Sequence, residues 1–311
     1  MENIIMRPEK LDKFIGQNLI KKNLIIYINA AIKRKECLDH IIISGTSGFG
    51  KTTLARIIKN EMGCDIKFTN GTNFKNVADI ISVVTSLKKG DILFIDEIHC
   101  INNKIEECLY SIMEDFRLDI VVGEGLEKRC LNIDIEHFTL IGATTNLGGL
   151  SKPFRNRFGI NFVMQNYEDE EIDEIIKYYF NSYKIIVDEE CLFVLRKVSK
   201  KTPRVIHNLV RRIRDFELKN NTLKLNNLHS ILNTLGFDET GLENIEVKII
   251  NDFYKFFKDG PVGIDAIVRL IDIDRDSMVD IYEPNLIKEG YMYKTSRGRM
   301  LTQKALDLIK E

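Results

Sequence analysis

Two short motifs carry the residues of this chain that could do chemistry. The first, residues 45–52, is Gly-Thr-Ser-Gly-Phe-Gly-Lys-Thr and fits the phosphate-binding pattern G-x-x-x-x-G-K-[ST] at every fixed position. Residues 41–44 before it predict a buried strand and residues 52–62 predict a helix, the context that the motif requires. Glycines let backbone N–H groups face phosphate oxygens, and the start of the helix adds positive potential. We therefore expect a nucleotide site in which Lys51 reaches the β- and γ-phosphates and Thr52 coordinates Mg²⁺.

The second motif is an apolar run, Asp91 to Ile95, that ends in the adjacent carboxylates Asp96 and Glu97. A central parallel strand is a nearly continuous apolar run, and open α/β sheets carry their chemistry at the carboxyl ends of strands. Asp96 is expected to hold Mg²⁺ directly or through water, and Glu97 to polarise the water that attacks the γ-phosphate. The alternative is a strand that ends in a solvated acidic turn. Hydrolysis, rather than nucleotide binding alone, is the more natural use of the second carboxylate.

Composition limits the class of protein. A length of 311 residues predicts two or three domains, and 44% hydrophobic with 29% charged residues is typical of a globular chain. The net charge of −1 provides no general basic field, so any DNA contact must come from a local patch.

An apolar run of transmembrane length and a signal-peptide layout are both missing, so no membrane association is expected. The six cysteines form no C-x-x-C pair, which argues against a zinc site and favours the cytoplasm.

Hydrophobic periodicity indicates three regions. Residues 1–165 alternate strand and helix patterns, as a parallel α/β sheet requires. Two short strand-like runs within residues 118–133 surround Gly123-Glu124-Gly125 and predict a β-hairpin. Residues 166–237 have helical spacing throughout and predict a small helical domain. The strands predicted in the first region are 64–69, 91–95 and 138–144, the helices there are 76–87 and 105–114, and those of the second region are 168–180, 188–199, 203–219 and 226–235.

The third region, residues 238–311, has the layout of a winged-helix module. A glycine-rich linker, residues 236–241, precedes it. Pro284 is expected to shorten or kink its third helix. In such modules, which are relatives of the helix-turn-helix, the third helix or the wing usually meets DNA. The predicted order is helices at 245–257, 264–271 and 274–288, then strands at 291–294 and 300–302, and a final short helix.

An ordered set of short segments along the whole chain resembles one family. The set is more specific than the phosphate loop, which alone would indicate only a large superfamily. The segments are Met6-Arg7-Pro8, Phe14-Ile15-Gly16-Gln17, Leu38-Asp39-His40, residues 45–52, Asn60-Glu61-Met62-Gly63, Leu93 to His99, Met113-Glu114-Asp115-Phe116, Gly123-Glu124-Gly125, Gly142-Ala143-Thr144-Thr145, Arg155 to Gly159, Thr202-Pro203-Arg204 and Gly260-Pro261-Val262-Gly263. This pattern resembles the RuvB family of ring-forming AAA+ ATPases, bacterial motors that drive branch migration of Holliday junctions.

The resemblance implies an α/β AAA+ P-loop core, a helical lid and a C-terminal winged-helix domain. It also implies roles at matching positions. Thr144 or Thr145 is similar to the first sensor, Arg204 to the second sensor, and Arg157 to the arginine finger that enters the ATP site of the next subunit. An ordinary surface salt bridge is the alternative for Arg157.

The implied residue sets are as follows. The catalytic residues are Lys51, Asp96, Glu97, Arg157 and Arg204, and the metal ligands are Thr52 and Asp96. The nucleotide-binding residues are Met6, Arg7, Ile15, Gly48, Gly50, Lys51, Thr52, Thr53, Glu114, Asp115, Phe116, Thr144, Arg157, Tyr167 and Arg204, with Arg7 and Ile15 bordering the adenine.

The resemblance also implies the partners. The hairpin is similar to the family's docking element for RuvA, the junction-binding protein. Leu131 and Ile133 would share one face of its second strand, although they could instead pack in the core. Arg275, Lys294 and Arg299 match DNA-contacting positions, and residues 288–304 hold five basic residues and one acidic residue. Contact with phosphates rather than bases is expected, because branch migration must pass any sequence.

The resulting expectation is an ATP- and Mg²⁺-dependent motor that forms a hexameric ring on duplex DNA. RuvA, the Holliday junction and copies of the chain itself are the expected partners, with a RuvC-type resolvase as a further candidate. The rival hypothesis is a clamp-loader-like or regulatory AAA+ switch that remodels a protein. A loader would end in a helical collar, whereas residues 238–311 predict helices followed by a wing.

Overall fold

A computed structural model describes residues 7–122, 129–216, 218–238 and 240–310 of the chain. The chain divides into two compact units. The first comprises Met1–Tyr183 and Lys201–Arg211, and the second comprises Lys184–Lys200 and Arg212–Glu311. Among the described residues, no helix is both long enough and apolar enough to cross a membrane.

A five-stranded parallel sheet with the order β2-β3-β6-β1-β7 forms the centre of the first unit. The β1, β3 and β6 strands are nearly continuous apolar runs that are buried on both faces, as the sequence predicted. Their register brings Ser44 level with Thr144, so the carboxyl ends of β1 and β6 share one edge. The strands are β1 (Ile41–Ser44), β2 (Ile66–Asn70), β3 (Ile92–Asp96), β6 (Thr139–Thr144) and β7 (Ile160–Val163).

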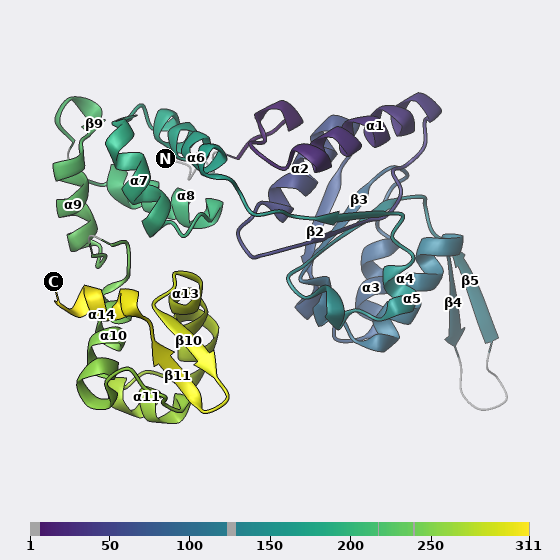
Figure 1. The fold of residues 1–311 in the computed structure, drawn as a ribbon. Helices are drawn as coiled ribbons and strands as arrows, with labels where there is room; N and C mark the ends of the chain where they lie inside the picture. The colour runs from purple at the N-terminus through teal and green to yellow at the C-terminus, as the bar shows by residue number, and fades with distance from the viewer. Residues whose placement is uncertain (1–6, 123–128, 217, 239, 311) are drawn as a thin grey trace. The chain divides into compact units, whose positions relative to one another are not determined.

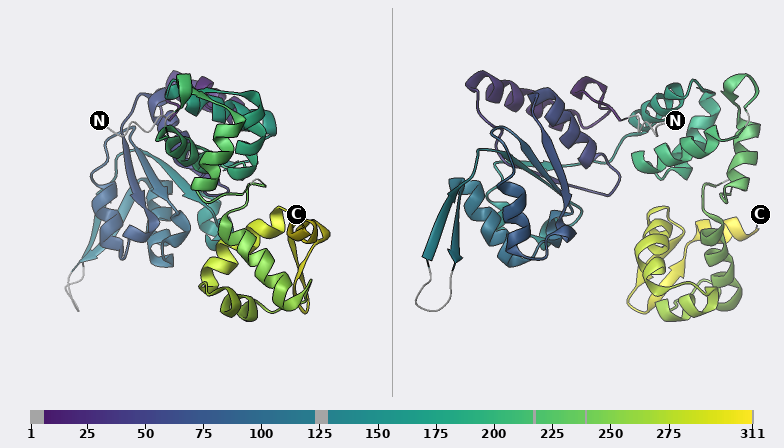
Figure 2. Two further views of the ribbon diagram at one scale, coloured as in Figure 1. Left: turned by 90° about the vertical axis from the view of Figure 1, so that its left-hand side faces the viewer. Right: turned by 180° about the vertical axis from the view of Figure 1, so that it is seen from behind.

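Helices cover both faces of this sheet (Figures 1 and 2). On one face, Ile42, Leu93 and Leu140 share a core with α3, α4 and α5. Because side chains alternate along a strand, their neighbours face the other side, where α1 packs on α2. The elements of the first unit that precede α8 (Pro203–Arg214), of which α1 to α5 cover the sheet, are α1 (Asn18–Arg34), α2 (Lys51–Met62), α3 (Val77–Val84), α4 (Asn103–Asp115), α5 (Lys152–Arg155) and α6 (Asp169–Ser182), with 3-10 turns η1 (Leu11–Lys13), η2 (Gly71–Asn73), η3 (Ile98–Cys100) and η5 (Leu147–Gly149).

The predicted hairpin is confirmed. β4 (Arg117–Val122) pairs antiparallel with β5 (Arg129–Asp134), and the pair extends away from the sheet beside α4 (Figure 1). The turn residues Gly123-Glu124-Gly125 lie outside the described part of the chain.

The second unit begins with helices that follow the predicted order. The α8 helix was predicted to reach residue 219 but ends at Arg214, where the N–H groups of Asp215 and Phe216 donate to carbonyl oxygens three rather than four residues back. The chain then turns through Asn220 and Asn221, both with positive φ, into β9. That strand forms a two-residue parallel pair with β8, which the sequence analysis did not predict. The elements are β8 (Ile186–Val187), α7 (Glu189–Val198), the end of α8 (Pro203–Arg214), η6 (Lys219–Asn221), β9 (Thr222–Leu223) and α9 (Leu225–Thr234).

A winged-helix module completes the second unit. Its third helix is interrupted: α12 leads into a π-helical turn, η7, and α13 then begins at Glu283. Pro284 has no N–H to donate to the preceding turn, which accounts for the break that the sequence predicted. The elements are α10 (Asn244–Phe257), α11 (Ile264–Ile271), α12 (Arg275–Ser277), η7 (Met278–Tyr282), α13 (Glu283–Lys288), the antiparallel strands β10 (Met292–Thr295) and β11 (Gly298–Leu301), and α14 (Gln303–Lys310).

Candidate active site

The phosphate loop joins β1 to α2 and depends on its glycines. Gly48 and Gly50 have φ values of +83° and +103°, which favour glycine. A Cβ on Gly48 would lie 2.9 Å from side-chain atoms of both Thr202 and Arg204, so no larger residue fits without a shift. Gly50 is the N-cap of α2, and the positive end of this helix therefore lies at the loop, where it favours an anion.

Lys51 folds back into the loop. Its Nζ donates hydrogen bonds to the carbonyl oxygens of Gly45 at 2.7 Å and Thr46 at 3.1 Å. Burial lowers the pKa of Lys51, while the nearby carboxylates of Glu97 and Asp96 act in the opposite direction. The ammonium group is thus positioned where phosphate oxygens would compete with the two carbonyls for it.

Thr52 and Asp96 meet at the carboxyl edge of the sheet. Thr52 Oγ1 lies 3.5 Å from Asp96 Oδ2, and Asp96 Oδ1 accepts a hydrogen bond from the Glu97 N–H at 3.1 Å. A hydroxyl next to a carboxylate matches the oxygen ligands that Mg²⁺ takes together with water and phosphate. The residues present therefore fit the predicted metal.

Glu97 is held from the end of the neighbouring strand. Its Oε2 accepts hydrogen bonds from the Thr145 N–H at 3.2 Å and the Thr145 hydroxyl at 3.0 Å, and lies 3.3 Å from His99 Nδ1. The backbone of Glu97 has φ of +45°, a conformation that is costly for a residue with a side chain. Gly71 permits this arrangement, because a Cβ there would lie 2.4 Å from the Glu97 carbonyl oxygen.

The two candidate sensors have different surroundings. Thr144 is fully buried, and its Oγ1 lies 3.0 Å from His99 Nδ1 and accepts a hydrogen bond from the Asn146 N–H. Thr145 instead contacts Glu97 directly. His99 Nδ1 therefore lies between Thr144 and Glu97.

A pocket of about 430 Å³ contains seven of the fifteen predicted nucleotide-binding residues, together with Asp96 and Glu97. Arg204 Nη1 donates to Ser47 Oγ at 3.1 Å, and the Arg204 N–H donates to the Gly48 carbonyl oxygen at 3.3 Å. Burial and the charge of Arg56 lower the pKa of Arg7, which also lines the pocket. The predicted residues that line it are Arg7, Gly48, Gly50, Lys51, Thr52, Thr53, Asp96, Glu97 and Arg204.

Other lining residues of this pocket were missed. His207, Asn208 and Arg211 follow Arg204 on α8 at helical spacing and line the same pocket. This helical spacing from Arg204 is the feature of the sequence from which their place in the pocket could have been predicted. Ser47, Tyr179 and Pro203 complete the lining.

Ile15 and Tyr167 line a smaller adjoining pocket that shares Gly50 and Thr53 with the first. The Tyr167 hydroxyl donates to the Phe49 carbonyl oxygen at 2.9 Å, which ties the start of the helical region to the phosphate loop. Burial raises the pKa of Tyr167 well above its usual range, so it remains a neutral donor. Met6 lies outside the described residues.

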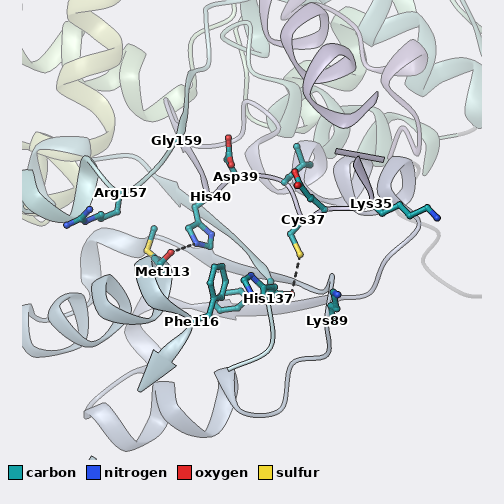
Figure 3. A pocket seen from close by; sticks show the side chains of 13 residues that line it. Lys35, Cys37, Asp39, His40, Lys89, Met113, Phe116, His137, Arg157 and Gly159 are labelled. Atoms are coloured by element: carbon teal, nitrogen blue, oxygen red, sulfur yellow. Dashed lines mark hydrogen bonds between the residues drawn. The ribbon is translucent and has the colours of Figure 1, made fainter. Parts of the chain in front are cut away.

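Arg157 is not among the residues that line the phosphate pocket. Its guanidinium makes two 2.9 Å contacts with the Glu114 carboxylate, stacks 4.2 Å from the centre of the Tyr110 ring and hydrogen-bonds the Tyr110 hydroxyl. Asp115 is the exposed last residue of α4, next to Glu114. Phe116 lines a second pocket of about 560 Å³ with Arg157 (Figure 3). The structure thus groups the 114–116 segment with Arg157.

Two family models match this chain. The model of the Holliday junction DNA helicase RuvB P-loop domain matches residues 6–164, and the model of the RuvB C-terminal winged helix domain matches residues 239–310. The chain belongs to the RuvB family. Its C-terminal winged helix stands where a clamp loader would carry a helical collar, so the loader hypothesis is not favoured.

Relatives and solved structures of RuvB cover nearly the whole chain. The Holliday junction branch migration complex subunit RuvB of Acholeplasma laidlawii is 42% identical over 310 residues, which are 99% of this chain and 92% of the relative. The same subunit of Kosmotoga olearia is 41% identical over 302 residues, which are 96% and 88% of the two chains. The solved Thermotoga maritima RuvB Holliday junction branch migration motor superposes with a TM-score of 0.80 at 37% identity and 98% coverage of both chains.

In the winged-helix module of this RuvB-family chain, the predicted DNA-contacting cations are paired with carboxylates. Arg299 makes two hydrogen bonds, 2.9 and 3.2 Å, to the fully buried carboxylate of Glu283, and Lys294 Nζ lies 3.0 Å from it. Arg275 pairs with Asp265 at 3.2 Å on the surface. Lys294 and Arg275 are mostly exposed, whereas the Arg299 side chain is only 19% exposed.

The predicted partner-binding residues lie on β5. Leu131 pairs with Ile120 across the hairpin, but its side chain lies outside the described part of the structure. Ile133 is half-buried and packs against the core beneath α4, which is the alternative that the sequence left open for it.

Proposed function

We propose that this protein is an ATP-driven motor that moves the branch point of Holliday junctions. The observation that carries the proposal is the convergence of Lys51, Thr52, Asp96 and Glu97 at one sheet edge, in a chain that ends in a RuvB-type winged helix. The names of the relatives, which are subunits of a branch migration complex, support the substrate.

Within one subunit, the loop binds the phosphates and the carboxylates act on water. Lys51 leaves the carbonyls of Gly45 and Thr46 for the β- and γ-phosphates. Thr52 and Asp96 hold Mg²⁺, which neutralises charge on the phosphates when it is bound. Glu97, oriented by Thr145, polarises the attacking water.

Arg157 completes the site of a neighbouring subunit. Its separation from the phosphate pocket of its own chain supports this role. A neighbour's γ-phosphate would compete with Glu114 for the guanidinium, and an arginine supplied there contributes about 10³–10⁵ in rate. Hydrolysis therefore depends on assembly, and we infer a ring of identical subunits, with six as the expected number. The segment 114–116, which is Glu114, Asp115 and Phe116, borders the neighbour's nucleotide on the same side as Arg157.

Nucleotide state is sensed by Arg204 and Tyr167, which both contact the phosphate loop. Arg204 lies at the start of α8, and this helix continues into the second unit. The winged-helix module then pulls duplex DNA through phosphate contacts of Arg275, Lys294 and Arg299. The pair of Arg275 with Asp265 is mostly exposed on both side chains, so it is weak and opens readily to phosphate. The Lys294 side chain is itself mostly exposed, although its partner Glu283 is buried.

The hairpin docks the junction-binding partner RuvA through Leu131, with Ile133 holding the strand against the core. The complex works in the cytoplasm. A RuvC-type resolvase could use the same junction, but no feature of the described residues favours its binding to this chain.

The experiment is ATP hydrolysis with and without four-way junction DNA and RuvA. The proposal predicts stimulation by both together. It also predicts that Leu131→Asp removes the stimulation by RuvA and leaves the basal rate, while Asn132→Asp, on the opposite face of the strand, leaves both. Equal rates for wild-type protein with and without junction and RuvA would contradict the proposal.

A further inference from the structure

A fully buried carboxylate lies at the start of the winged-helix module. Glu246, in the first turn of α10, is completely inaccessible to solvent. One oxygen accepts a hydrogen bond from Asn285 Nδ2 of α13 at 2.6 Å, and the other accepts from the Glu243 N–H at 2.9 Å. Glu246 therefore joins two helices of the module. A buried carboxylate also needs a cation.

That cation comes from outside the module. Lys200 Nζ lies 3.1 Å from Glu246 Oε1 and 3.4 Å from Glu243 Oε1. Lys200 follows the end of α7 in the helical region, 46 residues before Glu246 in sequence. The ion pair thus fixes the end of α7 to the module, within the second compact unit.

The four residues after Lys200 lead to the nucleotide site. The chain passes from the second unit to the first between Lys200 and Lys201, which both have φ of +51°. Lys201 forms an ion pair with Asp169 of α6, in the first unit. Thr202 and Arg204 then pack against Gly48 of the phosphate loop, and Arg204 hydrogen-bonds Ser47.

We propose that Lys200, seated on Glu246, is a positioning residue that transmits movement of Arg204 at the nucleotide to the winged-helix module. The proposal rests on the motor function proposed above. A displacement of Arg204 by a γ-phosphate moves the short segment 201–204, and Lys200 moves the module with it because its ammonium is anchored on Glu246. Neither residue of the pair lines the phosphate pocket.

The Lys200–Glu246 pair can transmit movement because its contacts hold both side chains in one arrangement. The Lys200 side chain is 20% exposed and faces two carboxylates, and Glu246 has additional donors from Asn285 and the backbone. Such a satisfied polar network specifies one arrangement of its helices. The pair Lys201–Asp169 is about half exposed on both side chains, so it provides a weaker attachment on the other side of the crossing.

The test compares Lys200→Met with two other variants. Lys200→Arg keeps the charge and should keep the pairing. Lys248→Met makes the same substitution at an exposed position of α10 and serves as the matched control. For each full-length protein, with RuvA and junction DNA, one measures junctions migrated per ATP hydrolysed, KM for ATP, DNA affinity and Tm.

We expect Lys200→Met to hydrolyse ATP with an unchanged KM and to bind DNA as wild type does. Its junctions migrated per ATP should fall by roughly fivefold or more, the lower range of coupling between sites. Lys200→Arg and Lys248→Met should keep the wild-type ratio.

An unchanged ratio for a folded Lys200→Met protein would overturn the inference and leave the motor function intact. If Lys200→Met does not fold, Lys200→Gln takes its place, and an unchanged ratio for this folded protein would overturn the inference in the same way. Failure of wild-type protein to migrate junctions would instead contradict the proposed function itself.

Discussion

Thr145 holds Glu97 by two hydrogen bonds to one carboxylate oxygen, 3.2 Å from its N–H and 3.0 Å from its hydroxyl. The contact joins the residue after β6 to the residue after β3, at the edge of the sheet where the phosphate loop begins. The orientation of the proposed catalytic carboxylate is therefore set from the end of the neighbouring strand. The strained backbone conformation of Glu97 persists only because the surrounding structure holds it.

Replacing Thr145 by Ala should lower kcat for ATP hydrolysis about 10²-fold, because a small misplacement of a catalytic group has effects of that order. KM for ATP should change little, since Thr145 lines neither nucleotide pocket. Thr145→Ser keeps the hydroxyl and should retain most of the rate. Steady-state kinetics checks this, and equal kcat for Thr145→Ala and wild type would show that the contact does not position Glu97 for hydrolysis.

Mixing two inactive variants tests whether Arg157 acts between subunits. Arg157→Ala alone should lose about 10³–10⁵ in rate, and Lys51→Ala should lose nucleotide binding. In a mixed ring, a Lys51→Ala subunit would supply Arg157 to the intact phosphate loop of its neighbour. We expect the mixture to recover part of the ATPase rate. A mixture as inactive as either variant alone would place Arg157 in its own subunit's site or in a structural salt bridge.

The site motifs could be predicted because they are local. The phosphate loop and the acidic strand each carry their residues within eight positions, and a parallel sheet brings their carboxyl ends together without further information. Thr52 and Asp96 therefore converge as expected. The partners of the wing cations could not be predicted, since Glu283 lies 16 residues from Arg299 in sequence and the two meet through the packing of α13 beside the wing.

Two elements with unclear hydrophobic periodicity, α1 and β7, were not predicted from the sequence. The α1 helix exposes Leu19, Ile26 and Ile32 as well as burying Ile20 and Leu24, so its apolar residues mark no single face. β7 is a four-residue edge strand in which alternate residues are exposed. Both elements become recognisable only in the structure, through their packing against the rest of the first unit.

The two wing cations should behave differently on substitution. Lys294→Ala should reduce the slope of log K for DNA against log salt by about one, as expected for one lost phosphate contact. Arg299→Ala should in addition lower Tm, because it removes the two-bond partner of the buried Glu283, and breaking such a pair costs about 3 kcal/mol or more. Salt titration of DNA binding and thermal unfolding measure these effects. Equal Tm changes for the two variants would contradict the anchoring role of Arg299.

Acid should destabilise the protein partly through His40. Its Nδ1 accepts from the Leu140 N–H at 2.9 Å and its Nε2 lies 3.2 Å from the Met113 carbonyl oxygen, so the neutral ring fits the site (Figure 3). Burial lowers the pKa of His40 below the value of about 6.5 in the unfolded chain. As the pH falls, the unfolded state therefore takes up the proton first. The contribution of neutral His40 to the free energy of unfolding is fully present above about pH 6.5 and is lost as the pH falls through the pKa of His40 in the folded protein.

Between about pH 7.5 and about pH 5.5, the Tm of His40→Gln should therefore fall by less than the Tm of wild type. At the higher pH, the Tm of His40→Gln should already be below that of wild type. His229→Gln is the control, a half-buried histidine in the second unit. An identical loss of Tm in His40→Gln and wild type would show that His40 does not contribute to acid sensitivity.

Branch migration of a synthetic four-way junction, with RuvA and ATP, tests the central claim most directly. Wild-type protein and Glu97→Gln are compared, because the amide keeps the shape of Glu97 but cannot polarise water as the carboxylate does. We predict that wild type separates the junction into duplex products and that Glu97→Gln binds ATP and DNA without separating it. ATP hydrolysis by wild type that leaves the junction intact, or separation by Glu97→Gln at the wild-type rate, would contradict the account.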